Sequence, residues 1–313
     1  MDAAFAQAVV EGLSKKNKHI SSQYFYDDRG SELFRRIMDL DEYYPTRCER
    51  EILSNRSAEI VAQIPGDGPI EIVELGAGDG SKTQILLKEF LVQGREVIYR
   101  PIDISAGAIE GLRDRLEQEV PGLKVRGLVG TYFAALGSLE VSEHPRLVLF
   151  LGSNIGNFND AEAIDFLYRL RTMTNRGDLL FCGFDLRKNP HIILAAYNDA
   201  EGVTREFNYN LLRRINQELD GDFDLDQWAH YPTYDPFVGQ VRSYLVSLRE
   251  QTVELGKLNT KVFFQRWESI HTETSNKFTP EGISMLASSS GFSEVAHWED
   301  AKGYFRDCLW AWK

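Results

Sequence analysis

The stretch that decides the fold reads Val73-Glu74-Leu75-Gly76-Ala77-Gly78-Asp79-Gly80-Ser81-Lys82-Thr83. An apolar segment, Ile70 to Leu75, leads into it and predicts a buried strand. The glycines that follow permit a tight turn and let the backbone approach a ligand that a Cβ atom would exclude. A helical pattern then begins at Ser81, and a helix N-terminus offers unpaired N–H groups. The stretch therefore predicts a cofactor site at Gly76 and Gly78.

The spacing of these glycines distinguishes between cofactors. The pattern E-x-G-x-G, with Glu74 just before the glycines, favours an S-adenosylmethionine (SAM) site over a dinucleotide site. A dinucleotide site has the pattern G-x-G-x-x-G, and its third glycine would fall at Ser81. The pattern of a phosphate-binding loop is absent, because Lys82 follows the glycines at the wrong distance. A plain strand-to-helix turn is the alternative.

A second acidic residue follows one strand later. The segment Glu96 to Ile104 predicts a strand, with Asp103 near its end. A carboxylate at that place can accept hydrogen bonds from the two ribose hydroxyls of an adenosine. The alternative is a helix N-cap, because Ser105 and a helical pattern follow. The offset from the glycine turn favours the ribose role for Asp103, with Ser105 as the separate cap.

Composition narrows the class of protein. A chain of 313 residues with 43% hydrophobic and 26% charged residues is typical of a globular protein of one large or two modest domains. Its formal net charge of −12 repels phosphate groups, so we expect no nucleic-acid or membrane partner. Cys48, Cys182 and Cys308 lack metal-ligand spacing and predict reduced thiols in a cytoplasmic protein without a metal. We expect a monomer without a signal peptide.

Alternation of strands and helices predicts the α/β class. Strands are expected near 70–76, 97–104, 123–130, 146–152 and 178–185, and helices at 81–93, 105–118 and 160–174. This order predicts a doubly wound, Rossmann-like sheet. A helix that starts at Thr279-Pro280-Glu281 and ends before Gly291, then strands at 292–298 and 304–312, closes the chain. That ending is typical of class I SAM-dependent methyltransferases.

The alternation is interrupted between residues 187 and 277. A helical region is expected at 194–218, and alternating segments at 242–254 and 261–273 predict antiparallel strands joined through Leu255-Gly256-Lys257. We therefore expect an inserted α+β substrate-binding domain. The expected domains are 56–186 plus 278–313 for SAM binding, and 1–55 plus 187–277 as a substrate-binding lid.

Five further blocks of sequence carry a resemblance to a known family. They are Tyr24 to Phe34, Glu42 to Arg47, Leu151 to Phe158, Ala195 to Asp199 and Thr272 to Phe278. Together they resemble the histidine-specific SAM-dependent methyltransferase family, from about residue 20 to the C-terminus. The resemblance implies an enzyme that trimethylates the α-amine of a small-molecule amino acid with three SAM molecules. With L-histidine the product is the betaine hercynine, the first step towards ergothioneine.

The resemblance implies roles for several residues of these blocks. Asn157 and Tyr197 would hold the main-chain groups of the substrate. Tyr26 and Tyr43 would contact the amine, because aromatic faces attract a methylated ammonium and phenol oxygens accept from N–H groups. Phe34 would cap the pocket. Without the resemblance, these residues have ordinary alternatives as a turn residue, a half-buried helix aromatic and packing within the lid.

A pair of residues on the last predicted strand of the insertion offers side-chain selectivity. Glu273 and Ser275 are two residues apart and so face the same side. A carboxylate and a hydroxyl can bond both nitrogens of an imidazole, one as donor and the other as acceptor or second donor. The resemblance implies that this pair selects histidine, whereas a solvated strand face is the alternative.

Two departures from the family pattern open other hypotheses. Val241 stands where histidine enzymes of the family tend to carry a longer Met, so a wider pocket for an indole or a phenol is possible. Glu273 argues against an indole, whose single N–H leaves a buried carboxylate half unpaired. Thr131-Tyr132 replaces an acidic residue that holds the adenine amino group in relatives, and a hydroxyl or backbone carbonyl can substitute for it.

Two points stay open. Lys82 is expected to contact the methionine carboxylate of SAM or to solvate the first helical turn. A regulatory protein that binds SAM without catalysis is a further hypothesis. The intact tyrosines and Asn157 argue against that loss of catalysis.

Overall fold

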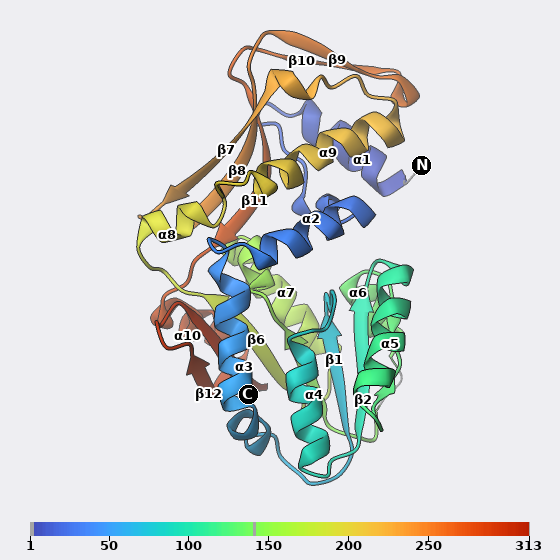
Figure 1. Cartoon of the computed structure of the whole chain (residues 1–313), viewed down its shortest axis with the longest axis vertical. Helices are drawn as coiled ribbons and strands as arrows, with labels where there is room; N and C mark the ends of the chain where they lie inside the picture. Colours follow the sequence, from blue (N-terminus) through green and yellow to red (C-terminus); the bar gives the residue numbers. More distant parts are fainter. Residues whose placement is uncertain (1–2, 140–141, 313) are drawn as a thin grey trace. The chain divides into compact units, whose positions relative to one another are not determined.

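The chain divides into two compact units (Figure 1). The structure, a computed structural model, describes residues 3–139 and 142–312. Unit 1 combines Met1–Tyr44 with Lys188–Lys277, and unit 2 combines Pro45–Arg187 with Phe278–Lys313. The boundary predicted at residues 55 and 56 falls inside helix α3 (Tyr44–Ala62). The division lies at the start of α3 instead, since this helix continues without a break into unit 2.

Unit 2 is built on one large sheet. Its strands are β1 (Ile70–Leu75), β2 (Val97–Asp103), β3 (Lys124–Val125), β4 (Leu128–Val129), β5 (Arg146–Phe150), β6 (Leu179–Asp185), β12 (Phe292–Glu299) and β13 (Phe305–Trp312). Their order is β12-β13-β6-β5-β1-β2-β3, with β4 also paired to β2. The first six strands pair in parallel, and β13 pairs antiparallel with β6 and β12. This topology confirms the Rossmann-like class I methyltransferase fold.

Three helices of unit 2 begin at residues whose side chains cap them. Besides α3, this unit contains α4 (Thr83–Val92), α5 (Ala106–Glu119), α6 (Tyr132–Gly137), α7 (Asp160–Thr172) and α10 (Pro280–Ser289), with the 3-10 turn η2 (Asn154–Asn157). The three capped helices are α5, α7 and α10. Asn159 and Glu162 form a capping box at α7, and the Thr279 hydroxyl accepts from the backbone N–H of Gly282 at α10. Strands β1 and β6 are buried at every residue, as expected for central parallel strands.

Unit 1 combines helices with two small antiparallel sheets. Its elements are α1 (Ala3–Ser14), η1 (Ser22–Phe25), α2 (Asp28–Asp39), α8 (Pro190–Ala195), α9 (Val203–Leu219), η3 (Leu225–Gln227), β7 (Trp228–Asp235), β8 (Gln240–Ser247), β9 (Gln251–Leu255), η4 (Gly256–Leu258), β10 (Thr260–Phe264) and β11 (Ser269–Asn276). One sheet has the order β11-β8-β7, and the other pairs β10 with β9.

The predicted elements of unit 1 needed three corrections. Each of the two long strands is broken into two, β8 and β9, and β10 and β11. The helical region 194–218 is likewise two helices, α8 and α9, separated by a turn. Strand β7 was not predicted because Pro232 interrupts its pattern. Its place at the edge of the sheet is where a strand tolerates a proline, which has no N–H to donate.

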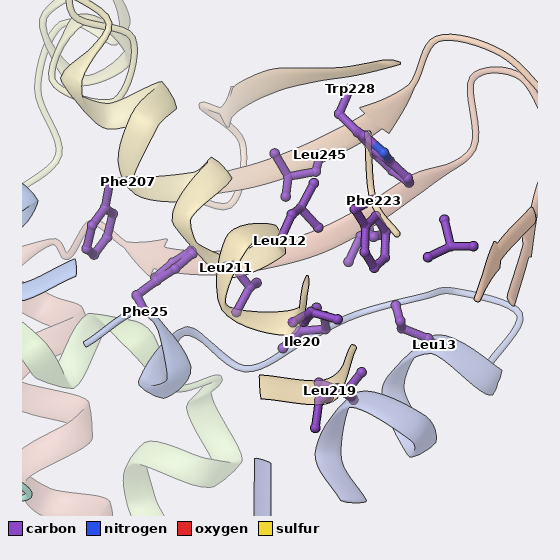
Figure 2. Packing of buried hydrophobic residues seen from close by; sticks show 14 of the residues in the cluster. Leu13, Ile20, Phe25, Phe207, Leu211, Leu212, Leu219, Phe223, Trp228 and Leu245 are labelled. Carbon is purple, nitrogen blue, oxygen red and sulfur yellow. The ribbon is translucent and has the colours of Figure 1, made fainter. Parts of the chain in front are cut away.

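Aromatic and aliphatic side chains form one core within unit 1 (Figure 2). The rings of Phe25 and Phe207 lie 4.6 Å apart between centroids. Farther along, the ring of Trp228 meets that of Phe264 edge-on, with centroids 4.9 Å apart and planes at 89°. These contacts join η1, α9, β7 and β10, so the two small sheets are held by packing against the same helix.

The three cysteines lie buried in unit 2 as free thiols. Cys182 and Cys308, distant along the chain, are register partners on the neighbouring strands β6 and β13. Among the helices of residues 3–139 and 142–312, none is long and apolar enough to cross a membrane.

Candidate active site

The glycine turn of unit 2 has the backbone conformation that the sequence predicted. Gly76, Gly78 and Gly80 have φ angles of +72°, +54° and +63°. A Cβ atom on Gly76 would lie 2.9 Å from the Tyr132 hydroxyl oxygen, whereas one on Gly78 would meet no described atom within 4 Å. The turn is therefore closed on the Tyr132 side and open beside Gly78. It can accept a ligand against its backbone, which fits SAM.

Glu74 connects the strand before this turn to the helix after it and to the neighbouring strand. Its carboxylate accepts hydrogen bonds from the Thr83 hydroxyl at 2.6 Å and from the Tyr99 hydroxyl. Burial raises the pKa of Glu74 to about 7 against the effect of these bonds. The acid of the E-x-G-x-G pattern thus ties β1 to the first turn of α4 and to β2.

Asp103 and Tyr132 lie at the edge of the same turn. Asp103 Oδ1 accepts from the backbone N–H of Ser105 at 3.0 Å, and the Ser105 hydroxyl caps α5 by accepting from Ala108 at 3.2 Å. The separate capping role predicted for Ser105 is confirmed. Burial, with the nearby charge of Asp103, raises the pKa of Tyr132 to about 12. Thr131 precedes α6 as an exposed N-cap residue without a side-chain cap bond.

Lys82 has a partner that the sequence did not suggest. Its Nζ pairs with Oε2 of Glu49, a fully buried residue of α3. The other oxygen of Glu49 accepts from the backbone N–H of Gly152 at 2.8 Å. Asp307 of β13 is buried beside them, and burial and the charge of Glu49 raise its pKa well above the ordinary value. Nothing in the sequence distinguishes Glu49 from the neighbouring charged residues Arg47, Arg50 and Glu51 of α3.

The loop after β5 brings an asparagine to the glycine turn. Ser153 has a left-handed φ of 56°, and its hydroxyl accepts from the backbone N–H of Asp185 at 2.9 Å. Asn154 Nδ2 would lie 3.7 Å from a Cβ on Gly76. Asn157, which the resemblance implies in substrate binding, is exposed at the end of η2, and Asn154 was given no role from sequence.

In unit 1, two side chains of β11 and its end form a hydrogen-bonded group with Tyr197. Lys277 Nζ donates to the Tyr197 hydroxyl and to Ser275 Oγ, each at 2.8 Å. The Tyr197 hydroxyl donates to Ser275 Oγ, also at 2.8 Å. All three residues are buried. Tyr197 and Ser275, which were predicted separately, are therefore brought together, and Lys277 is an addition.

Glu273 lies on this same side of β11. Burial raises the pKa of its carboxyl to about 7, and the positive charge of Lys277 opposes that shift. Ser243 of β8 is its register partner. Val241, which is 1% exposed, is the register partner of Ser275.

A β-bulge sets the register of Glu273. The pairing of β11 with β8 shifts between His271 and Glu273, which leaves Thr272 as the extra residue. The Thr272 hydroxyl bonds Oδ1 of Asn208 at 2.7 Å, and Asn208 is fully buried on α9. The contact with α9 thus stabilises the bulge. After the bulge, Glu273, Ser275 and Lys277 lie on the same side of β11.

Aromatic residues of unit 1 form a second group. Phe34 meets the rings of Tyr26 and Tyr43 edge-on, with centroids 5.5 and 6.1 Å apart. Phe207 of α9 joins them, 5.7 Å from Tyr26 and 5.9 Å from Phe34. The three residues chosen from sequence are thus brought together, while Phe207 was missed because its helical spacing is that of an ordinary core residue.

Comparison with known proteins agrees with these features. The profile of the family described as "Histidine-specific methyltransferase, SAM-dependent" matches residues 5–312. The Histidine N-alpha-methyltransferase of Mycolicibacterium smegmatis is 36% identical over 304 residues, which cover 96% of this chain and 93% of that protein. The protein of the same name from Mycobacterium tuberculosis is 35% identical over 302 residues, with the same coverage of both chains. Ergothioneine biosynthesis protein 1 of Schizosaccharomyces pombe is 31% identical over 309 residues, which cover 96% of this chain and 39% of that protein.

Proposed function

The chain belongs to the family of histidine-specific, SAM-dependent methyltransferases, and we propose that it converts L-histidine to hercynine by three transfers to the α-amine. The observation that carries the choice of substrate is the polar face of β11. There a carboxylate, Glu273, and a hydroxyl, Ser275, share one side of the strand. This is the set of groups that a neutral imidazole needs, one acceptor and one donor.

Residues of unit 2 would hold SAM. The backbone at Gly76 and Gly78 leaves room for it, Asp103 would accept from the ribose hydroxyls, and Thr131 and Tyr132 would border the adenine. Lys82, whose ammonium donates to Glu49, would use a further donor for the methionine carboxylate. When bound, SAM supplies an electrophilic methyl group on a sulfonium. Its transfer to nitrogen is a displacement that needs positioning rather than a covalent enzyme intermediate.

Residues of both units have proposed roles toward the amino acid. Tyr197 and Asn157 would hold its carboxylate. Tyr26 and Tyr43 would hold the amine, with Phe34 beside them. A free α-amine titrates near pH ~8, so a neutral fraction exists near pH 7 without a strong base. Aromatic rings still attract the amine after N–H groups are lost, whereas a carboxylate pair would keep it protonated.

Val241 is the feature that supports a second substrate. It is buried directly opposite Ser275, so its size affects the space beside the proposed selecting pair. An indole or a phenol would use that space, but an indole offers one N–H and leaves the Glu273 carboxylate half paired. Histidine therefore remains the better fit. The free buried thiols and the relative named for ergothioneine biosynthesis support a reaction in the cytoplasm, early in the route to that compound.

A product analysis tests this proposal. The protein is mixed with SAM and L-histidine, and mass spectrometry follows mono-, di- and trimethylated histidine while S-adenosylhomocysteine is counted. We expect trimethylhistidine as the final product, with three molecules of S-adenosylhomocysteine per product. Binding of SAM without any methylated histidine would contradict the proposal and would favour a regulatory role.

A further inference from the structure

Lys277 is a buried cation that the proposed function does not use. It is 3% exposed, and its ammonium donates to two hydroxyls of the proposed substrate-binding set, Tyr197 and Ser275. Its backbone N–H is also fixed, since it donates to the carbonyl of Gly239 at 2.7 Å. Burying an ammonium is costly unless it is well bonded, so its position next to the selecting pair calls for a functional explanation.

The hydrogen bonds around Ser275 determine what its hydroxyl can offer. A serine hydroxyl has two acceptor lone pairs and one hydrogen. Lys277 donates to one lone pair, and the Tyr197 hydroxyl, a more acidic phenol, donates to the other. With both acceptor positions taken, Ser275 is left to act as a donor. Glu273 on the same side of β11 is an acceptor when ionised.

Several groups that face this pair can be named. Lys277 is the charged group that acts on Glu273, and the group opposite Glu273 on β8 is the neutral Ser243. Opposite Ser275 lies the apolar Val241. Tyr197, from the turn between α8 and α9, is a further titratable neighbour. A second positive charge on the ligand would therefore face Lys277 in a buried place, where charges are poorly screened.

We propose that Lys277 is a positioning residue that makes the site select the neutral form of the histidine side chain. It does so by turning Ser275 into a hydrogen-bond donor and by repelling an imidazolium. The ring nitrogen without a proton would accept from Ser275, and the ring N–H would donate to Glu273. The inference rests on the proposed function, because it specifies which form of the proposed substrate binds.

An internal competition tests the inference. Histidine and its 1,2,4-triazolylalanine analogue, whose ring stays uncharged, are mixed with the protein and SAM, and the ratio of methylated products is measured at several pH values. Both amino acids meet the same enzyme, so titrations of the enzyme that affect the two substrates equally cancel in the ratio. With an imidazole pKa of about 6.5, the neutral fraction of histidine falls about tenfold between about pH 7.5 and about pH 5.5. We expect the product ratio to fall by the same factor.

Variants of Lys277 complete the test. In Lys277→Met, which loses the charge and its donors, the ratio should change less than twofold over the same range. Lys261→Met, an exposed lysine of β10 in the same unit, is the matched control and should keep the wild-type dependence. Thermal unfolding checks that each variant is folded. If Lys277→Met does not fold, Lys277→Leu, which likewise has neither charge nor donors, is measured in its place with the same expected result.

The outcomes separate the two proposals. A wild-type product ratio that does not change with pH overturns the role of Lys277, and so does a tenfold fall that persists in the uncharged variant. In both cases histidine is still methylated and the proposed function survives. If the wild-type protein methylates neither amino acid, the proposed function itself fails.

Discussion

Glu273 is the residue on which substrate choice depends in this account. Glu273→Ala removes the acceptor for the ring N–H, and an unpaired buried donor costs about 1–3 kcal/mol. We expect kcat/KM for histidine to fall correspondingly, by more than for any other amino acid the enzyme accepts. Glu254→Ala, an exposed glutamate of β9, is the matched control and should change little. An equal loss for all amino acids would show that Glu273 does not contact the side chain.

Tyr43 is the residue that should control the number of transfers. Tyr43→Phe keeps the ring that packs on Phe34 and its attraction for a methylated cation. It removes an oxygen that can orient the amine, an effect of about 0.5–1.5 kcal/mol. Turnover should fall about tenfold, and mono- and dimethyl products should accumulate. Tyr231→Phe on the exposed side of β7 provides the control.

One result would contradict the proposed role of Tyr43. A Tyr43→Phe enzyme that forms trimethylated product at the wild-type rate, with no intermediates, would show that the tyrosine only packs within unit 1. The mass spectra of a single time course distinguish the two cases.

Gly76 is the residue whose substitution should reduce the affinity for SAM most. Gly76→Val places a side chain at a positive φ and 2.9 Å from the Tyr132 hydroxyl, so we expect calorimetry to detect no SAM binding. Gly94→Val is the matched control, because Gly94 also has a positive φ, of +79°, but has no described atom within 4 Å of an added Cβ. Unchanged affinity in a folded Gly76→Val protein would remove the assignment of this turn.

At the scale of elements, the free energy of unfolding should depend on pH through Glu74, which links β1 to the first turn of α4. The pKa of Glu74 is raised by burial to about 7, above its ordinary value of about 4.3. Between these values the folded state keeps a proton that the unfolded state has released, so this residue lowers the free energy of unfolding as pH rises. The full effect, reached above about pH 7, is about 4 kcal/mol.

Substitution of Glu74 isolates this effect. Glu74→Gln cannot ionise, so its free energy of unfolding in urea, relative to wild type, should increase between about pH 5 and about pH 8. The comparison cancels contributions from other groups, including Glu273, whose pKa is raised in the same direction. A difference between the two proteins that is independent of pH would contradict the assignment of a raised pKa to Glu74.

Elements whose determinants are local were predictable from sequence, and those set by distant partners were not. The turn at Gly76, the cap at Ser105 and the turn between β9 and β10 depend on neighbouring residues and were found. Strand β7 was missed because only its place at a sheet edge makes Pro232 acceptable. The breaks between β8 and β9 and between β10 and β11 were missed because the alternating pattern runs through them.

The same distinction holds for the candidate site. Glu273 and Ser275 were predicted to share one side of a strand from its periodicity, whereas Val241 was singled out by the resemblance to the family. Glu49 was missed because its partners are far away in sequence, Lys82 at 33 residues and Gly152 at 103. Lys277 lay within a recognised block, but its bond to Tyr197 spans 80 residues and could not be read from spacing.

At the scale of the whole molecule, the proposed cofactor and substrate residues belong mainly to different units. Each unit is formed by two segments of the chain. Unit 2 carries the glycine turn and its neighbours, and unit 1 carries the polar face of β11 and the aromatic group. The account therefore predicts that changes in one unit alter recognition of one ligand. Glu273→Ala should leave the affinity for SAM unchanged, which the same calorimetry can check.

The most direct test of the central claim offers the protein every candidate substrate at once. The full chain is incubated with SAM and an equimolar mixture of the twenty amino acids, and the masses of all methylated products are recorded. The account predicts that histidine gains three methyl groups and that no other amino acid is methylated at a comparable rate. Preferential methylation of tryptophan, tyrosine or another amino acid, with histidine left unchanged, would contradict it.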